Sequence, residues 1–109
     1  MQPTNIEKLA AETEITREED TDLDTALSGG YGVFVHNDEI TPYDFVISVL
    51  IRFFKLNAAD AEAITWKAHN SGSALVAVLP LSDAQAKVGR AHFAASLEGY
   101  PLTFTIEVE

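Results

Sequence analysis

Hydrophobic and polar residues follow regular periods from residue 31 onward, and three segments have the pattern of strands. Residues 31–36 are rich in aromatic and β-branched side chains, which favours a strand. Residues 74–79 are wholly apolar and stop at Pro80, which predicts a short strand with little exposed surface. Residues 102–108 alternate between apolar and polar, which predicts a half-buried strand. The side chains predicted to point inward are Leu102, Phe104, Ile106 and Val108.

Three further segments repeat apolar residues at the spacing of an amphipathic helix. The first helix is expected to follow Thr41, with Pro42 in the first helical position, where no backbone donor is needed. The second is expected to end at Gly72, and the third, over 83–97, at Gly99. The predicted N-terminal caps are Thr41, Asn57 and a capping box of Ser82 with Gln85.

The predicted order is therefore β-α-α-β-α-β. Three strands cannot bury their apolar face alone, so helices must cover one side of the sheet. We expect a two-layer sandwich of the α+β class, with a domain of about eighty residues and a modest core.

Residues 1–30 differ from the rest in composition. They contain eight acidic and two basic residues, no aromatic residue, and a final Ser-Gly-Gly. Such a segment buries too little apolar area to offset the entropy of ordering it. The sequence therefore predicts a flexible acidic extension over residues 1–30 and a folded domain over 31–109. The extension either keeps the protein in solution or engages a partner.

Composition excludes several classes of function. The chain has no cysteine, so it has neither disulfides nor thiolate metal sites. Its net charge of -10 makes nucleic acid a poor partner, because only seven scattered basic residues could meet phosphates. No apolar run reaches membrane-spanning length, and from the acidic N-terminal composition we expect neither a secretory nor a transit signal. We expect a cytoplasmic, monomeric protein without a cofactor, whose acidic charge favours cationic partners.

The segment 36–46 carries the most information about function. A strand ends in Asn37 and Asp38, and the chain turns at once into a helix. This arrangement places polar side chains at a rim, where a ligand can be held. Asn and Asp also favour turns for purely local reasons, so the pair alone does not establish a site.

An ordered set of residues from Tyr31 to the end of the chain resembles the ClpS adaptor family, which feeds N-degron substrates to Clp AAA+ unfoldases. The resemblance begins with the run Asn-Asp-Glu-Ile-Thr-Pro at 37–42 and continues through apolar pairs of the first helix. It extends to Ala68-His69, Gly72, Ala86-Lys87-Val88, Pro101-Leu102 and Ile106-Glu107. It implies a three-stranded antiparallel sheet with three helices, in the order predicted above. It also implies an adaptor and not an enzyme.

The resemblance implies a site for the first residue of a substrate chain and a face for the N-domain of the unfoldase. The residues implied to hold the free α-amino group are Asn37, Asp38 and His69. The implied pocket for a bulky apolar side chain consists of Ile40, Thr41, Tyr43, Val46, Thr65, Ala68 and Leu102. The implied docking positions are Ser82, Gln85 and Lys87.

Physical chemistry explains why such a site needs these residue types. An α-ammonium has three donors, and each must find an acceptor when it leaves water. The Asp38 carboxylate, the Asn37 amide oxygen and a neutral His69 nitrogen can supply them. A protonated His69 would repel the ligand, so binding should weaken as the pH falls through the range in which histidine titrates.

Three departures from the family pattern matter. Typical members carry a flexible Met where this chain has Tyr43 and another where it has Thr65, so the pocket should differ in shape. We expect Leu, Phe, Tyr or Trp to be accepted as the first residue, in an altered ranking. Typical members also have acids where this chain has Ser82 and Gln85, although Lys87 is kept. A ClpS-like protein-interaction module, or a decoy with altered specificity that binds degrons without delivering them to a standard unfoldase, is therefore an alternative.

Other functions have weaker support. His69, Ser71 and Asp38 are the residue types of a catalytic triad, but no nucleophile elbow accompanies them. His36, Asp38, Glu39 and His69 lack a strong metal-ligand spacing. The element order also resembles the C-terminal domain of the ribosomal stalk protein, which recruits factors through a basic helix face that the sequence does not predict here. Among the other residues, we expect His92 on the exposed side of the third helix.

Overall fold

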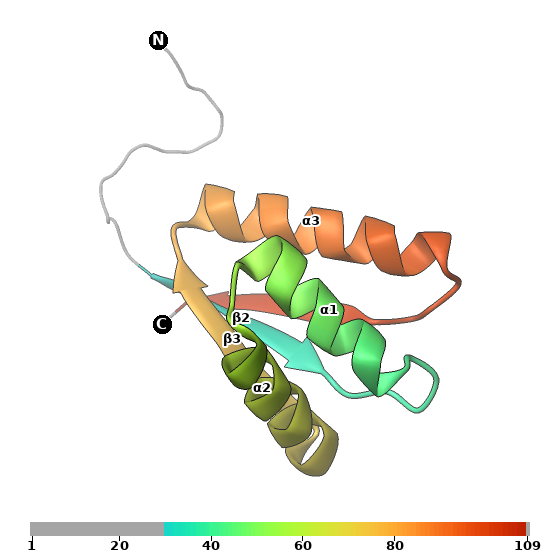
Figure 1. The fold of residues 1–109 in the computed structure, drawn as a ribbon. Coiled ribbons are helices and arrows are strands. Elements are labelled where there is room, and N and C mark those ends of the chain that lie inside the picture. The colour runs from blue at the N-terminus through green and yellow to red at the C-terminus, as the bar shows by residue number, and fades with distance from the viewer. Residues whose placement is uncertain (1–29, 109) are drawn as a thin grey trace, which may run out of the picture.

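The computed structural model describes residues 30–108, which form one sheet and three helices (Figure 1). The elements in chain order are β2 (Tyr31–His36), α1 (Tyr43–Phe54), α2 (Ala58–Ser71), β3 (Ser73–Leu79), α3 (Leu81–Leu97) and β4 (Thr103–Val108). Both pairings are antiparallel, and the strand order is β3-β2-β4. The α+β sandwich and its β-α-α-β-α-β order are confirmed. The predicted flexible extension lies outside the described residues, apart from Gly30.

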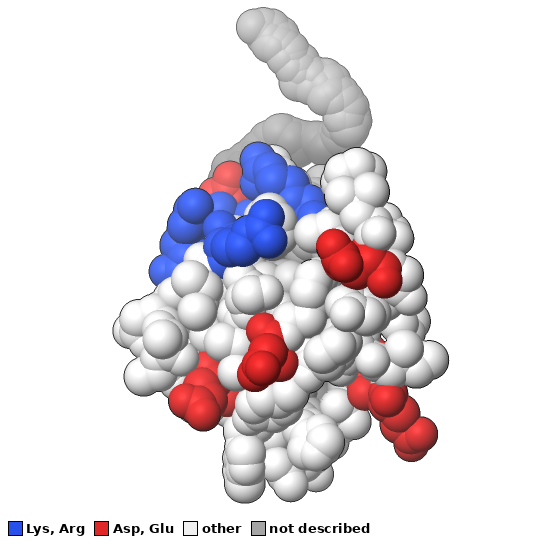
Figure 2. Space-filling model, turned by 45° about the vertical axis from the view of Figure 1, so that its right-hand side comes forward, with Lys and Arg blue, Asp and Glu red and all other residues white. Residues whose placement is uncertain are grey.

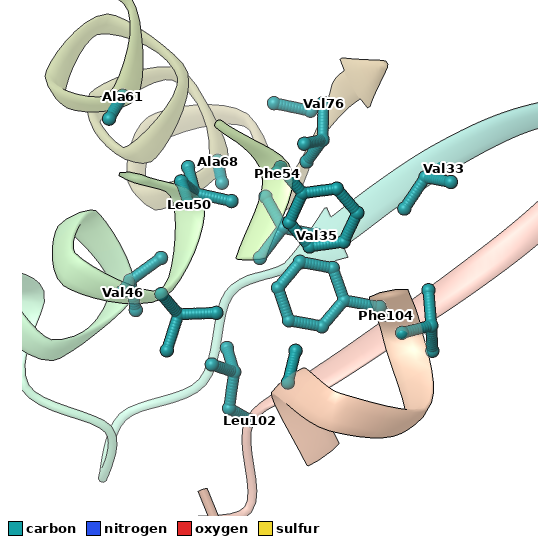
Figure 3. Close-up of a cluster of buried hydrophobic side chains, with 14 of the residues drawn as sticks. Val33, Val35, Val46, Leu50, Phe54, Ala61, Ala68, Val76, Leu102 and Phe104 are labelled. Atoms are coloured by element: carbon teal, nitrogen blue, oxygen red, sulfur yellow. The ribbon is translucent and has the colours of Figure 1, made fainter. Parts of the chain in front are cut away.

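The helices cover one face of the sheet, and the core lies between the two layers (Figure 1). The central strand supplies Val33 and Val35, both fully buried. Phe54 of α1 stacks on Phe104 of β4, with ring centroids 5.3 Å apart, and joins the helix layer to an edge strand (Figure 3). Burial of side chains of this size contributes about 1.5–3 kcal/mol each, so this contact is a main support of the fold.

Two of the three predicted helix starts are wrong in detail. Pro42 is the N-cap of α1, and Thr41 does not cap it, because the Thr41 hydroxyl bonds to Asp38 instead. Helix α3 begins at Leu81 with Pro80 as its N-cap and has no side-chain cap, so the capping box of Ser82 and Gln85 does not form. The fixed φ of proline prepares each start without a side-chain acceptor.

The cap of α2 is confirmed. The side-chain oxygen of Asn57 accepts a hydrogen bond from the Asp60 N–H at 2.8 Å. The helix ends at Gly72, whose φ of 98° is accessible to glycine and strained for other residues. Gly72 therefore sets the direction in which the chain leaves α2 and enters β3.

Two predicted side-chain orientations are corrected. His92 is half-buried, and its Nε2 accepts a hydrogen bond from the Phe104 N–H at 2.9 Å. Desolvation lowers the pKa of His92 below its ordinary value. Val108 is 76% exposed because it is the last residue of β4, beyond the helices that cover Phe104. In the described part of the chain, no helix has the length and apolar character to span a membrane.

Candidate functional site

Asp38 organises the turn between β2 and α1. Its Oδ1 accepts hydrogen bonds from the backbone N–H groups of Ile40 at 2.8 Å and Thr41 at 2.6 Å. Its Oδ2 accepts a third bond, from the Thr41 hydroxyl, at 2.8 Å. Partial burial acts to raise the pKa of Asp38, but the three hydrogen bonds outweigh it and hold the pKa below its ordinary value. The carboxylate is therefore ionised and fixed in position at neutral pH.

A backbone hydrogen bond ties this turn to the end of α2. The Asn37 N–H donates to the Gly72 carbonyl at 2.9 Å, and the Gly72 N–H donates to the Ala68 carbonyl at 2.8 Å. His69 lies on the last turn of α2, directly after Ala68. The turn and the helix end, although distant in sequence, are thus held side by side.

A pocket of about 300 Å³ opens between the turn, α1 and α2. Its lining combines polar and apolar side chains. The lining residues are Val35, His36, Asn37, Asp38, Glu39, Thr41, Tyr43, Val46, Thr65, Ala68 and His69.

The structure brings together most of the residues that the sequence singled out. All three residues assigned to the amino group line the pocket, as do five of the seven assigned to the side chain. The two exceptions are Ile40 and Leu102. Ile40 lies on the outside of the turn and is 68% exposed, whereas Leu102 is 5% exposed and belongs to the core.

Three further residues, Val35, His36 and Glu39, line the pocket but were not assigned to the amino group or to the side chain, although His36 and Glu39 fall within the segment 36–46 predicted to form a rim. Val35 and His36 end β2, directly before the turn, so their position in the strand was the available signal. The Nε2 of His36 lies 2.8 Å from the Thr105 hydroxyl on the neighbouring strand, within hydrogen-bonding distance. Glu39 is exposed at the rim, beside Asp38.

Two residues give this pocket its particular shape. The Tyr43 ring meets the His69 ring edge-on, with centroids 6.0 Å apart. Thr65 is buried, and its hydroxyl donates to the Ala61 carbonyl at 2.7 Å. The Thr65 hydroxyl proton is therefore used within its own helix and is not available to a ligand.

The geometry of the described residues does not support the two alternative sites, a metal site and a catalytic triad. Within residues 30–108, no cluster of three or more histidine, aspartate or glutamate side chains is placed to hold a metal ion. The hydrogen bonds of Asp38 go to Ile40 and Thr41, not to His69 or Ser71, so a triad is not assembled.

The residues assigned to docking lie elsewhere, in the first two turns of α3. Ser82 and Gln85 are exposed and Lys87 is half-buried, and none of the three lines the pocket. Docking and ligand binding would therefore use separate surfaces of the domain.

The comparisons with known proteins agree with one another. The family model described as ATP-dependent Clp protease adaptor protein ClpS matches residues 28–105. The chain is 38% identical over 88 residues to the ATP-dependent Clp protease adapter protein ClpS of Nautilia profundicola, covering 81% of this chain and 91% of that protein. It is 43% identical over 79 residues to the adapter protein ClpS 2 of Mesorhizobium japonicum, covering 72% and 78%.

A solved structure is similar as well. Agrobacterium tumefaciens ClpS2 bound to L-phenylalaninamide superposes with a TM-score of 0.72 at 34% sequence identity. The match covers 74% of this chain and 98% of that one.

Proposed function

The chain belongs to the ClpS family of Clp protease adaptors, and from this premise we propose that its pocket binds the first residue of substrate proteins. The protein then presents the bound chain to a Clp AAA+ unfoldase and performs no cleavage of its own. The observation that carries the proposal is the convergence of Asn37, Asp38 and His69 on one pocket. A cytoplasmic location and a monomeric state remain predictions.

The polar residues that line the pocket suit an α-ammonium group. A carboxylate offers about four acceptor sites, of which Asp38 uses three within the turn. The remaining site on Oδ2 can accept one ammonium proton, and the Asn37 amide oxygen and a neutral His69 nitrogen can accept the others. The lowered pKa of Asp38 supports this role, since it keeps the carboxylate charged at neutral and mildly acidic pH, where the ligand amine is also charged.

The volume of the pocket and its apolar lining residues suit one large side chain. Its volume of about 300 Å³ is at the low end of ligand pockets, which supports a single residue rather than a longer peptide. L-phenylalaninamide, the compound bound to the Agrobacterium relative, has a free amino group and one bulky apolar side chain. We expect Leu, Phe, Tyr and Trp to be accepted, in an order set by Tyr43 and Thr65.

The energetics predict modest affinity. Charge-assisted hydrogen bonds contribute roughly 1.5–3 kcal/mol each, and burial of a large apolar side chain adds roughly 1.5–3 kcal/mol. Association opposes this by about 4–15 kcal/mol. A dissociation constant of micromolar order, about -8 kcal/mol, is the tightest binding that these values allow, and it suits an adaptor that must release its cargo.

The deciding experiment uses two peptides that begin with Phe and differ only in a free or acetylated N-terminus. We expect micromolar binding of the free amine and a loss of at least 100-fold on acetylation. A third peptide with Asp in first place should bind as weakly as the acetylated one. Equal binding of all three peptides would contradict the proposal.

Delivery is tested separately, because Ser82 and Gln85 replace the acids typical of the family and thereby favour a second function. A decoy would bind the same peptides without passing them on. A Phe-first reporter is incubated with a Clp unfoldase and its peptidase, with and without this protein. Faster degradation supports the adaptor, whereas protection of the reporter supports the decoy.

A further inference from the structure

The basic residues are scattered along the sequence, but four of the five lysine and arginine side chains in residues 30–108 gather on one part of the domain. Figure 2 shows them as a single blue group near one end of the visible face. The described residues contain five such side chains, and Lys67 is the one on α2. The other four lie at the end of α1 and in the first half of α3, and we call them the basic surface: Arg52, Lys55, Lys87 and Arg90.

The two halves of the basic surface face each other. Arg52 lies two helical turns after Phe45, on the same side of α1. The Phe45 ring packs edge-on against Tyr100 at 4.9 Å, and Tyr100 follows α3 with its N–H bonded to the Ala95 carbonyl. That side of α1, with Arg52 on it, therefore faces α3.

The geometry of α3 agrees. His92 marks the side of α3 that faces β4, because it accepts the Phe104 N–H. Helical spacing places Lys87 and Arg90 about 140–160° around the helix from His92, on the side of α3 that faces away from β4. Asp83 shares this side but is a single acid among four bases. The region thus has a local positive charge on a protein of net charge -10.

The position of the chain entry identifies a segment that can reach this surface. Gly30 precedes Tyr31, which pairs with Leu79 at the end of β3, and α3 begins at Leu81. Residues 1–29 are therefore joined to the domain beside the first half of α3. These residues contain eight acids and two bases, and all the acids fall within 7–24.

We propose that the acidic stretch 7–24 of this same chain binds the basic surface. The charges are complementary, and the short connection gives the segment an effective concentration of about millimolar order at the surface. An acidic partner protein would have to exceed that concentration to occupy the surface unaided. Lys87 belongs to the face assigned to the unfoldase, so the extension and the unfoldase compete for it.

The chain contains no cysteine, so Thr13→Cys creates one labelling position within the acidic stretch. A nitroxide at this position broadens the amide NMR signals of nearby residues. At low salt, we expect the amides of residues 52–55 and 87–90 to lose at least half of their intensity. At about 0.5 M salt the intensity should return, because the screening length falls to roughly 4 Å.

Charge variants of the full chain separate the proposal from non-specific proximity. The double variant Lys87→Glu with Arg90→Glu should abolish the broadening, whereas Lys67→Glu on α2 should leave it unchanged. Broadening that persists in the double variant and at high salt, or no broadening at low salt, would overturn the proposal. So would broadening that appears only between a labelled and an unlabelled molecule, since the occupant would then be a second copy.

The double variant also keeps this test independent of the proposed function. None of the basic surface lines the pocket, so binding of a Phe-first peptide should be unchanged in the double variant. Loss of the broadening with intact peptide binding supports the inference. Loss of both would show that the variant is misfolded, and the single variant Arg90→Gln, which should reduce the broadening at least twofold, then decides.

Discussion

The ring of Tyr43 meets the imidazole of His69 edge-on, at 6.0 Å and with an interplanar angle of 87°. The two residues come from the first turn of α1 and the last turn of α2, and both line the pocket. Aromatic pairs in this arrangement contribute about 0.5–1.5 kcal/mol beyond their buried area. Tyr43 thus restrains the imidazole that is proposed to accept an ammonium proton.

Replacement of Tyr43 by Ala should weaken binding of a Phe-first peptide by about 2- to 12-fold, which is that contribution expressed as an affinity ratio. Titration with a fluorescent peptide measures it. Tyr43→Phe is the matched control and should retain most of the affinity, because the ring is kept. An equal loss in both variants would show that the hydroxyl, and not the ring, acts.

Asp38→Asn should reduce peptide binding at least tenfold with little change in the midpoint of thermal unfolding. The amide retains one oxygen for the N–H groups of Ile40 and Thr41 but removes the charge. Asp38→Ala removes all three hydrogen bonds and should lower the midpoint as well. If Asn and wild type bind equally, charge at this position has no role in the ligand complex.

The pKa of Asp38 determines how its contribution to folding stability changes with pH. The pKa of its carboxyl is lower in the folded protein than its ordinary value of 3.8. The stabilisation is therefore complete above pH 3.8 and is lost only as the pH falls through the lowered value. Its contribution to stability should be constant between pH 5 and 8, and Asp38→Asn should show the same stability difference from wild type at both limits.

Gly72→Ala should destabilise the protein by about 1–2 kcal/mol, because its φ of 98° is strained for a residue with a side chain. It should also weaken peptide binding, since the Gly72 carbonyl holds Asn37. Gly89→Ala is the control: Gly89 lies in α3 with open space around it, and the change should stabilise by about 0.5–1 kcal/mol. Urea unfolding of both variants measures the opposite signs.

His92 should make the fold sensitive to mild acid. Burial lowers its pKa in the folded state below the ordinary 6.5, so the unfolded chain binds a proton that the folded chain does not. Stability is complete above pH 6.5 and decreases as the pH falls below it. His92→Gln can still accept the Phe104 N–H and should unfold at a urea concentration that changes less between pH 7.5 and 5.5. An unchanged pH dependence would mean that another group is responsible.

Hydrophobic periodicity was sufficient to predict all six elements and the layer that each joins. Caps were less predictable, because a hydroxyl or carboxylate near a helix start has several possible donors. The Thr41 hydroxyl bonds to Asp38, whereas the Asn57 side chain bonds to Asp60 of the helix that it caps. Local sequence cannot decide between such partners without the position of the turn.

The polar rim of the site could be predicted, but parts of its wall could not. The sequence around Val35 predicts an ordinary core residue. Val35 lines the pocket only because β2 ends beside it. The surroundings of His92 depend on β4, which lies twelve residues further along at the contact. Contacts of this kind between separate elements arise when the elements pack together. The local sequence contains no pattern that predicts them.

The three hydrogen bonds that Asp38 makes within its own turn have a kinetic consequence. These bonds hold the turn between β2 and α1 in place before a substrate chain binds. Binding of the substrate therefore needs no folding step, and little ordering entropy opposes it. Capture should then occur at the ordinary encounter rate of about 10⁵–10⁷ per molar per second. With micromolar affinity, each complex would last for less than about ten seconds, so many different chain ends can be sampled in quick succession.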